Sequence, residues 1–324
     1  MRVIYMGTPD FAVGTLEALI TAGHDICLIV TQPDKPQGRS KEMQPSPVKQ
    51  AAVRHGISVY QPVNMKDPAC LEALRKVQAD VIVVVAFGQI LPKVILGMTP
   101  YGCINVHASL LPAYRGAAPI QWAIIRGETV TGVTTMQMDE GLDTGDMILK
   151  AEVRIDPDET GESLHDKLAA AGAVLCVETL AALEDGTAVF ECQKETTTEY
   201  AKMLTKEMGR IDWSKSAIEI ERLVRGLNSW PCAYTYWDGK AIKVWGAKAI
   251  LNATGSDDND QSVLETDHVV PGTVVKVDKE HFYVQTGSGL LKLLELQMPG
   301  KKRMTTDAFL RGYPIRPGIV LDSN

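Results

Sequence analysis

The stretch Val81-Ile82-Val83-Val84-Val85-Ala86-Phe87 decides the fold class of this sequence. A strand with one face in water alternates apolar and polar residues, whereas a parallel strand covered on both faces is apolar throughout, as this stretch is. Amphipathic stretches separate it from other short apolar runs, and such alternation is typical of βαβ units around a parallel sheet. The sequence therefore predicts an α/β protein whose N-terminal part is a Rossmann-like parallel sheet with flanking helices.

The elements expected in this part follow from the same patterns. The expected strands are residues 2–6, 25–31, 80–85, 102–106, 134–138 and 147–155, and the expected helices are residues 10–22, 47–55, 68–77 and 161–183, with a further helix that begins near 117–119. Residues 32–47 are rich in proline and basic side chains, and we expect a loop without secondary structure there.

The character of the sequence changes after Gly186, where a polar stretch at 193–209 is expected to link two domains. A predicted helix at 217–227 precedes short predicted strands, which are residues 233–237, 242–247, 272–277, 281–286 and 290–297. Several short strands with Gly and Asp turns suggest a small β-barrel. The expected domains are thus 1–189, a linker at 190–209, and 210–324.

Composition limits the classes of protein that remain possible. The chain has 324 residues, of which 45% are hydrophobic and 23% charged, as is usual for a globular protein of about two domains. No apolar run approaches the ~20 residues that cross a bilayer, and no export signal is recognisable, so no membrane partner is expected. Six dispersed cysteines without a CxxC pair argue against a disulfide framework and against a zinc or other metal site. They suit a reducing, cytoplasmic location.

The net charge of −7 excludes a general nucleic-acid coat, because phosphate binding needs positive potential. Any polyanionic partner must therefore be held by local basic patches. No exposed heptad or apolar stripe demands a second subunit, and a monomer is expected.

The first loop, Met6-Gly7-Thr8-Pro9-Asp10-Phe11, follows a predicted strand and precedes a predicted helix, as a dinucleotide-binding fingerprint does. It has one glycine where the fingerprint needs three, and Pro9 and Phe11 fill the space that a pyrophosphate needs. An NAD-dependent oxidoreductase is therefore disfavoured. A tight strand-to-helix turn with Asp10 near the helix start is the better interpretation.

Three polar residues of the segment 101–145 carry the candidate chemistry. Asn105 and His107 lie two positions apart at the end of a predicted strand, so their side chains share one side of the sheet. Asp143 lies in a glycine-flanked loop between two predicted strands, from which a carboxylate can fold back over the crevice at the strand ends.

An amide, an imidazole and a carboxylate together suit acyl transfer to an amine. Asn105 can donate to the oxyanion, His107 can take a proton from the amine, and Asp143 can orient the imidazole. Ser109 lacks a GxSxG elbow, which argues against a serine nucleophile. Each residue alone has a plainer interpretation as scaffold, turn former or loop cap, and spacing does not establish the trio.

Two motifs resemble the folate-dependent formyltransferases: Asn105-Val106-His107-Ala108-Ser109-Leu110-Leu111-Pro112 and Leu142-Asp143-Thr144-Gly145. Within that family, the chain is most similar to members that act on methionyl-tRNA. Four further motifs carry this likeness: Gly7-Thr8-Pro9-Asp10-Phe11, Arg115-Gly116-Ala117-Ala118-Pro119-Ile120-Gln121, Met136-Gln137-Met138-Asp139 and Gly209-Arg210-Ile211-Asp212-Trp213.

The resemblance implies 10-formyltetrahydrofolate as the donor co-substrate and the α-amino group of initiator methionyl-tRNA as the acceptor. It implies that Asn105, His107 and Asp143 are the catalytic residues. It also implies a folate pocket, and the residues expected around the folate are Phe87, Gly88, Gln89, Ile90, Leu91, Ser109, Leu110, Leu111, Pro112 and Asp139. The bland alternative for the leucines and Ile90 is ordinary core.

The expected contacts with tRNA are basic residues of two segments. Arg39 and Lys41 lie in the loop at 32–47, which similar formyltransferases use to hold the acceptor end. Lys301, Lys302 and Arg303 follow the last predicted strand of the C-terminal domain, which resembles an OB-like barrel, and Lys206 lies in the linker. A solvated surface is the plainer interpretation of each.

Two other functions remain open from the sequence. One is formyl transfer to a small amine such as an amino-sugar nucleotide, and the other is an RNA-binding module with a vestigial catalytic domain. The C-terminal domain and Arg39 favour tRNA over an amino sugar, and the presence of all three polar residues disfavours the vestigial domain.

Overall fold

The structure is a computed structural model that describes residues 1–37, 42–196, 198–251 and 269–321. Its contacts divide the chain into two compact units, the first comprising residues 1–119, 129–155 and 164–202 and the second residues 120–128, 156–163 and 203–324. Residues 190–202, in the expected linker, thus belong to the first unit. None of the helices in the described part is both long and apolar enough to cross a membrane.

The first unit is built on a seven-stranded sheet. In spatial order its strands are β5 (Val59–Tyr60), β2 (Asp25–Val30), β1 (Arg2–Gly7), β6 (Val81–Val85), β7 (Cys103–His107), β8 (Val130–Gln137) and β9 (Met147–Arg154). All five residues of β6 are buried, in agreement with the continuous apolar run that predicts a covered parallel strand.

Strands β5, β2, β1, β6 and β7 are parallel, as expected. Strand β8 runs antiparallel to β7, and β9 antiparallel to β8, which the sequence analysis does not anticipate. The residues between β8 and β9 form no helix, and a parallel pair needs a longer crossover connection, so these two strands can only be antiparallel. The carboxyl ends of β1, β6 and β7 share one edge of the sheet.

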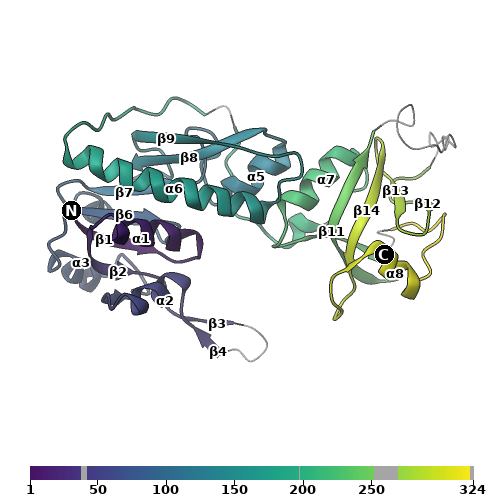
Figure 1. The fold of residues 1–324 in the computed structure, drawn as a ribbon, viewed down its shortest axis with the longest axis horizontal. Coiled ribbons are helices and arrows are strands. Elements are labelled where there is room, and N and C mark those ends of the chain that lie inside the picture. Colours follow the sequence, from purple (N-terminus) through teal and green to yellow (C-terminus); the bar gives the residue numbers. More distant parts are fainter. Residues whose placement is uncertain (38–41, 197, 252–268, 322–324) are drawn as a thin grey trace. The chain divides into compact units, whose positions relative to one another are not determined.

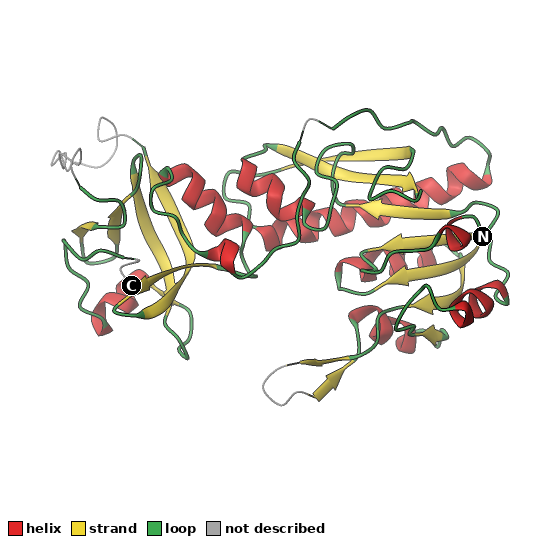
Figure 2. Cartoon of the chain, turned by 180° about the vertical axis from the view of Figure 1, so that it is seen from behind, coloured by secondary structure: helices red, strands yellow, loops and turns green. Residues whose placement is uncertain are grey.

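Helices cover both faces of this sheet (Figure 1; Figure 2 gives the view from behind). On one face, β1 and β6 pack in a core cluster with α3 (Pro68–Arg75) and α4 (Lys93–Leu96). On the other, α1 (Phe11–Thr21) contacts β1, β2 and β6, and Gly172 of α6 (Gly161–Glu184) lies against Val106 and Val133. The helix α2 (Pro47–Arg54) contacts β2 and α1.

Asp10 is the N-cap of α1 and accepts a hydrogen bond from the backbone N–H of Phe11. Gly7 has no room for a side chain, since a Cβ there would lie 2.8 Å from the Cβ of Ala12. Phe11 is buried and packs edge-on against His165. The loop is therefore a tight strand-to-helix turn, in agreement with the sequence analysis.

The prediction of a loop without secondary structure at 32–47 is wrong. Strand β3 (Lys35–Gln37) pairs antiparallel with β4 (Glu42–Gln44), and the two form a separate hairpin. Proline at position 36 argues against a strand in a pattern analysis, because it has no N–H to donate. It is tolerated in β3 because an edge strand needs no N–H at that position.

The second unit contains a six-stranded antiparallel sheet. Its strands are β10 (Ala233–Trp237), β11 (Lys240–Ile250), β14 (Leu290–Gln297), β13 (Phe282–Gln285) and β12 (Val274–Val277), paired in that order, with β15 (Met304–Thr305) beside β14. The remaining elements are α5 (Pro119–Arg126), most of which lies in this unit, the 3₁₀ turn η1 (Glu207–Gly209), α7 (Ala217–Gly226) and α8 (Thr306–Gly312). The expected C-terminal β domain is thus present.

Two strands, β8 and β11, extend beyond their predicted bounds, and each contains a glycine. In β8, Gly132 lies so close to the carbonyl oxygen of Ala151 that a Cβ would come within 2.1 Å of it. In β11, the register shifts at Gly246, which marks a β-bulge. The predicted strand 134–138 begins after Gly132, whereas the predicted strand 242–247 already contains Gly246 and is too short at both ends. The short elements β5, α4, β15 and α8 are also not predicted, because they are too short to show a periodicity.

Candidate active site

Asn105 and His107 lie at the carboxyl end of β7, on the same face of the sheet as Cys103. Cys103 belongs to the core cluster under α3 and α4, so that face is closed at its start and carries polar side chains at its end. His107 is buried, and Asn105 is half-buried. The predicted relation between these two side chains is therefore present in the fold.

The side-chain amide of Asn105 makes no hydrogen bond with any residue that the structure describes. Its backbone pairs with Val84 and Met136 in the neighbouring strands, so its position is fixed by the sheet. A half-buried amide with a fixed backbone and unused donors can bind an oxygen atom of a ligand.

Both ring nitrogens of His107 face oxygen atoms. Nε2 lies 3.2 Å from the carbonyl oxygen of Tyr114, and Nδ1 lies 3.7 Å from Oδ1 of Asp143. A carbonyl oxygen only accepts, so Nε2 carries the hydrogen atom and donates a hydrogen bond to the carbonyl oxygen of Tyr114. In the neutral ring, Nδ1 therefore carries the lone pair, and it points toward Asp143.

Asp143 reaches His107 because the connection between β8 and β9 folds back. Strand β8 ends opposite Ile104, yet the carboxylate lies beside His107 at the other end of β7. Asp143 has a left-handed backbone with φ 57°, and its Oδ2 accepts a hydrogen bond of 2.9 Å from the N–H of Gly116. The Gly116 contact leaves Oδ1 as the oxygen that faces His107.

Sequence reasoning does not single out Gln193, which lies in the expected linker. Its Nε2 donates to the carbonyl oxygens of Asp143 and Gly145, at 2.9 and 2.7 Å. Its Oε1 accepts from Nε and Nη2 of Arg115, also at 2.9 and 2.7 Å. Only Arg115 carries a signal, because it belongs to a motif of the resemblance.

The segment after Gln193 is held against the site loop as well. Thr198 accepts a hydrogen bond from the backbone N–H of Tyr114 at 2.7 Å, and Ala201 accepts from the N–H groups of Ala117 and Ala118. Burial and the negative charge of Asp143 both raise the pKa of the Tyr200 phenol. Residues 193–196 and 198–201 therefore form a wall of the site region.

A cavity of about 390 Å³ opens beside Asp143. Its lining consists of Arg115, Leu142, Thr144, Thr196, Thr198, Glu199 and Tyr200. Leu142 is 59% exposed and Tyr200 46%, so two large side chains with apolar surface lie open there. Such a cavity can take an apolar group of a ligand.

The residues expected around folate after β6 differ in how far they reach the surface. Phe87 and Leu91 are buried in the core cluster of α3 and α4, while Gly88 and Ile90 are exposed. Gln89 donates to the carbonyl of Pro62 and accepts from the N–H of Met65, which anchors this loop.

Two other side chains fix the backbone of the same loop. Gln32 donates to the carbonyls of Phe87 and Gly88, and Thr8 donates to that of Phe87. Asp139 is exposed and accepts from Gly141 and Thr144 within its own loop.

Two of the four residues expected around folate after β7 are buried. Ser109 is fully buried, and its hydroxyl donates to the carbonyl of Ala113 at 2.6 Å. Leu111 is buried against Met136 and Met147. Leu110 and Pro112 are half-buried and remain available for contact.

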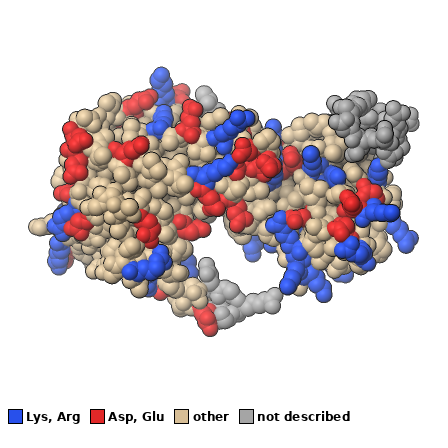
Figure 3. All heavy atoms as spheres, viewed as in Figure 1, with Lys and Arg blue, Asp and Glu red and all other residues tan. Residues whose placement is uncertain are grey.

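The basic residues expected at the tRNA lie partly in the described structure. Lys206, Lys301, Lys302 and Arg303 are exposed, whereas Arg39 and Lys41 lie outside the described residues. Figure 3 shows basic side chains gathered on one side of the second unit.

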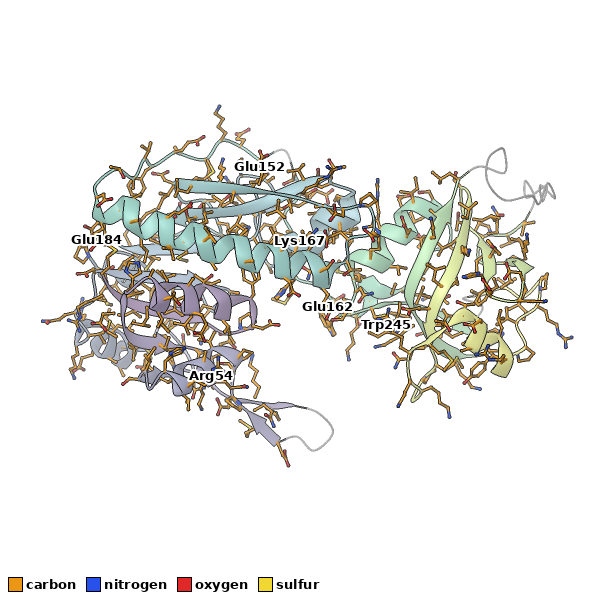
Figure 4. The ribbon with its side chains drawn as sticks, in the orientation of Figure 1. Arg54, Glu152, Glu162, Lys167, Glu184 and Trp245 are labelled. Carbon is orange, nitrogen blue, oxygen red and sulfur yellow. The ribbon has the colours of Figure 1, made fainter. Side chains whose placement is uncertain are left out.

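Arg303 pairs with Glu295, and its guanidinium lies 5.1 Å from the ring centre of Trp245. Trp245, labelled on the second unit in Figure 4, also lies 5.6 Å from the ammonium of Lys243. Of the expected basic residues, Arg303 thus lies over a half-buried aromatic ring, together with Lys243, and such a combination of cations and an aromatic ring suits RNA.

Comparison with known proteins identifies close relatives. The model of the formyl transferase family matches residues 1–180, and the model of the formyl transferase C-terminal domain matches residues 203–314. The methionyl-tRNA formyltransferase of Agathobacter rectalis is 60% identical over 318 residues, which are 98% of each chain. Those of Lachnospira eligens and Clostridioides difficile are 55% and 48% identical over 321 residues, which are 99% of this chain and 99% and 100% of theirs.

Solved structures with much lower identity share the fold. The sugar 3N-formyl transferase WlaRD, solved in the presence of dTDP and 5-N-formyl-THF, gives a TM-score of 0.65 at 16% identity over 93% of this chain and 99% of that chain. HypX from Aquifex aeolicus in complex with tetrahydrofolic acid gives 0.59 at 18% identity over 96% of this chain and 47% of that chain.

Proposed function

The chain belongs to the methionyl-tRNA formyltransferases, within the formyl transferase family, and from this premise we propose how it formylates methionyl-tRNA. The donor is 10-formyltetrahydrofolate, and the acceptor is the α-amino group of methionyl-initiator-tRNA. Asn105, His107 and Asp143 catalyse a direct attack of the amine on the formyl carbon, without a covalent enzyme intermediate. The product supports the initiation of translation.

The observation that carries this proposal is that Asp143, from a loop distant in the sequence, lies beside His107, which shares a strand with Asn105. Oδ1 of Asp143 lies 3.7 Å from Nδ1 of His107, and Asn105 lies on the same strand and the same face as His107. We infer that the three groups act together at the carboxyl edge of the sheet, where α/β folds bind ligands.

His107 is the general base. Because Nε2 donates to Tyr114, the lone pair of the neutral ring is on Nδ1, which can take a proton from the attacking ammonium. Once Nδ1 is protonated, the positive imidazolium faces the carboxylate of Asp143. The imidazolium then returns this proton to the folate nitrogen as the bond between that nitrogen and the formyl carbon breaks, so tetrahydrofolate leaves. The carboxylate also attracts the cationic acceptor to the same place, so it contributes both before and after proton transfer.

Asn105 stabilises the oxyanion. As nitrogen attacks, the formyl oxygen gains negative charge, and the unused N–H groups of Asn105 are available to donate to it. Loss of one such donor typically costs about 3 kcal/mol of transition-state stabilisation. The sheet fixes the backbone of Asn105, so little reorganisation is needed during the reaction.

The loop after β6 fits a flat polar heterocycle with an apolar flank. Gln32 and Thr8 fix its backbone, and Gly88 and Ile90 remain exposed beside it. Ile90 is 68% exposed, a large apolar surface that a bound pterin would cover. Solved proteins of the same fold contain 5-N-formyl-THF or tetrahydrofolic acid, which supports a folate donor here. The neighbours that act on sugars share only the fold at 16 to 17% identity.

The test is a single-turnover assay with defined acceptors. The purified chain is mixed with 10-formyltetrahydrofolate and methionyl-initiator-tRNA, and in parallel with a dTDP-amino sugar. We expect formylmethionyl-tRNA and no formylated sugar. Formylation of the sugar alone would reject the tRNA acceptor, and tRNA binding without any product would reject catalysis.

A further inference from the structure

We propose that Gln193 is a positioning residue for formyl transfer, which acts by holding the turn that carries Asp143. The inference rests on the proposed role of Asp143. Gln193 itself touches neither His107 nor Asn105 through any hydrogen bond among the described residues.

Backbone pairing places Gln193 at this turn. Glu191 and Met147 exchange two hydrogen bonds, at 2.8 and 2.9 Å, in an antiparallel bridge. Residues advance in opposite directions along such a pair, so Gln193 comes to lie opposite Gly145. The side chain of Gln193 thus continues the pairing that the backbone begins.

The amide of Gln193 uses its full hydrogen-bonding capacity. Its two N–H groups meet the carbonyls of Asp143 and Gly145, and its oxygen accepts both hydrogen bonds from Arg115. A guanidinium only donates, so the amide oxygen must face Arg115 and the NH₂ group must face the turn. Arg115 therefore fixes which end of the amide meets the Asp143 turn.

The turn needs such a clamp because its backbone is constrained. Asp143 has φ 57°, a conformation that is unfavourable for most residues with a Cβ. At Gly145 a Cβ would lie 1.7 Å from the carbonyl oxygen of Gln137, so the chain is pressed against β8. The carbonyls of Asp143 and Gly145 converge on one nitrogen atom, and without that donor their dipoles would repel each other.

The clamp also couples the turn to the loop that holds the Asp143 carboxylate. Arg115, at one end of the clamp, directly precedes Gly116, whose N–H donates to Oδ2 of Asp143. The loop that contains Arg115 and Gly116 thus holds both the backbone of Asp143, through Gln193, and its carboxylate. A loss of the clamp would let the carboxylate move relative to His107, while the folate loop after β6 would be unaffected.

The variant Gln193→Glu tests this role, since it keeps the size of the side chain and an acceptor for Arg115. It replaces the NH₂ group with an oxygen atom that faces two carbonyls. We expect kcat to fall about 10²-fold, the effect of a misplacement of about 1 Å, with KM for both substrates nearly unchanged. Gln193→Met removes the hydrogen bonds without adding charge and should lower kcat likewise.

Gln78→Glu is the matched control, because Gln78 is exposed just before β6, at the opposite end of that strand from its catalytic edge. It should leave kcat unchanged. An equal loss of kcat in Gln78→Glu, or an unchanged kcat in both Gln193 variants with their thermal unfolding intact, would overturn the inference.

A double-mutant cycle with Asp143→Asn separates the inference from the proposed function. If Gln193 acts through Asp143, Gln193→Glu has almost no further effect on kcat in the Asp143→Asn background. Independent, multiplicative effects would overturn the positioning role and leave the catalytic role of Asp143 standing. An unchanged kcat in Asp143→Asn alone would reject both.

Discussion

The Asp143 carboxylate divides its two oxygens between two partners: Oδ2 accepts from the N–H of Gly116 at 2.9 Å, and Oδ1 lies 3.7 Å from Nδ1 of His107. That second distance is longer than a normal hydrogen bond. This distance suits a carboxylate that forms a hydrogen bond with Nδ1 only after Nδ1 is protonated, because the two groups attract each other strongly only when the imidazole is charged. The geometry predicts which changes affect the chemical step.

Replacing His107 by alanine should lower kcat by about 10²- to 10⁴-fold, since the proposed general base is lost. The ring is buried at one end of β7, but its hydrogen bond with the Tyr114 carbonyl is a local contact, so the fold should survive. Single-turnover kinetics would check this, with the affinity for folate measured separately as a control. A variant that no longer folds would show that His107 is a core residue.

Asn105→Ala should reduce kcat by about 10²- to 10³-fold and leave the free energy of unfolding nearly unchanged. The reason is that the amide has no hydrogen-bond partner among the described residues, so its removal breaks no contact of the folded chain. Kinetics of the variant test the expected loss of kcat, and thermal unfolding of the same preparation tests the expected stability. An unchanged kcat would remove Asn105 from the oxyanion site.

The variant Ser109→Ala distinguishes a structural role of Ser109 from a role in folate binding. Its hydroxyl is fully buried and donates to Ala113, so Ser109→Ala should cost roughly 1 to 3 kcal/mol of stability through the unpaired carbonyl. The KM for folate should stay within about twofold, because the side chain cannot reach a ligand. A large rise in that KM with intact stability would contradict this prediction.

Sequence patterns predicted most of the parallel sheet because its strands are buried on both faces. The run at β6 and the two-residue spacing of Asn105 and His107 both translate directly into geometry, since alternation along a strand is fixed. The hairpin of β3 and β4 was missed because it has no buried face to produce a pattern, and all three described residues of β4 are exposed.

The sequence points to candidate site residues that are chemically unusual and passes over those that are ordinary. Asp143 is a carboxylate in a glycine-flanked loop, which drew attention to it. Gln193 lies in a polar stretch that looks like a linker, and its role depends on the Glu191–Met147 bridge, which no local periodicity encodes. Ser109 belongs to a motif of the family, yet its burial can be seen only in the fold.

Lys302 and Arg303 should differ in their contribution to tRNA binding although they are neighbours. Each lost phosphate contact lowers the salt dependence of log K by roughly 0.7 to 0.9, and Lys302→Ala should show this change. Arg303 is already paired with Glu295 and lies over Trp245, so Arg303→Ala should show less. The slope of log(kcat/KM) for tRNA against log[KCl] measures both.

Lys279→Ala is the control for that comparison, since Lys279 is exposed in the turn between β12 and β13. It carries the same change of charge on the same unit and should not alter the slope. Equal slopes for the wild-type chain and Lys302→Ala would show that this basic segment faces solvent and does not contact tRNA.

The capping box of α7 predicts a pH-dependent contribution to the stability of the second unit. Ser216 and Glu219 exchange hydrogen bonds at the start of the helix, and those from Ser216 hold the pKa of Glu219 below its ordinary value of 4.5. A lowered pKa means that this stabilisation is fully present above about pH 4.5 and is lost as the pH falls through the folded-state pKa.

Ser216→Ala should therefore cost about 1 kcal/mol at neutral pH and progressively less below pH 4.5. Tryptophan fluorescence reports on this unit alone, because all five tryptophans lie within it, at positions 122, 213, 230, 237 and 245. Urea unfolding followed by that signal, at several pH values, gives the difference directly. A penalty that stays constant down to about pH 3 would mean that the Ser216 cap acts independently of the Glu219 charge.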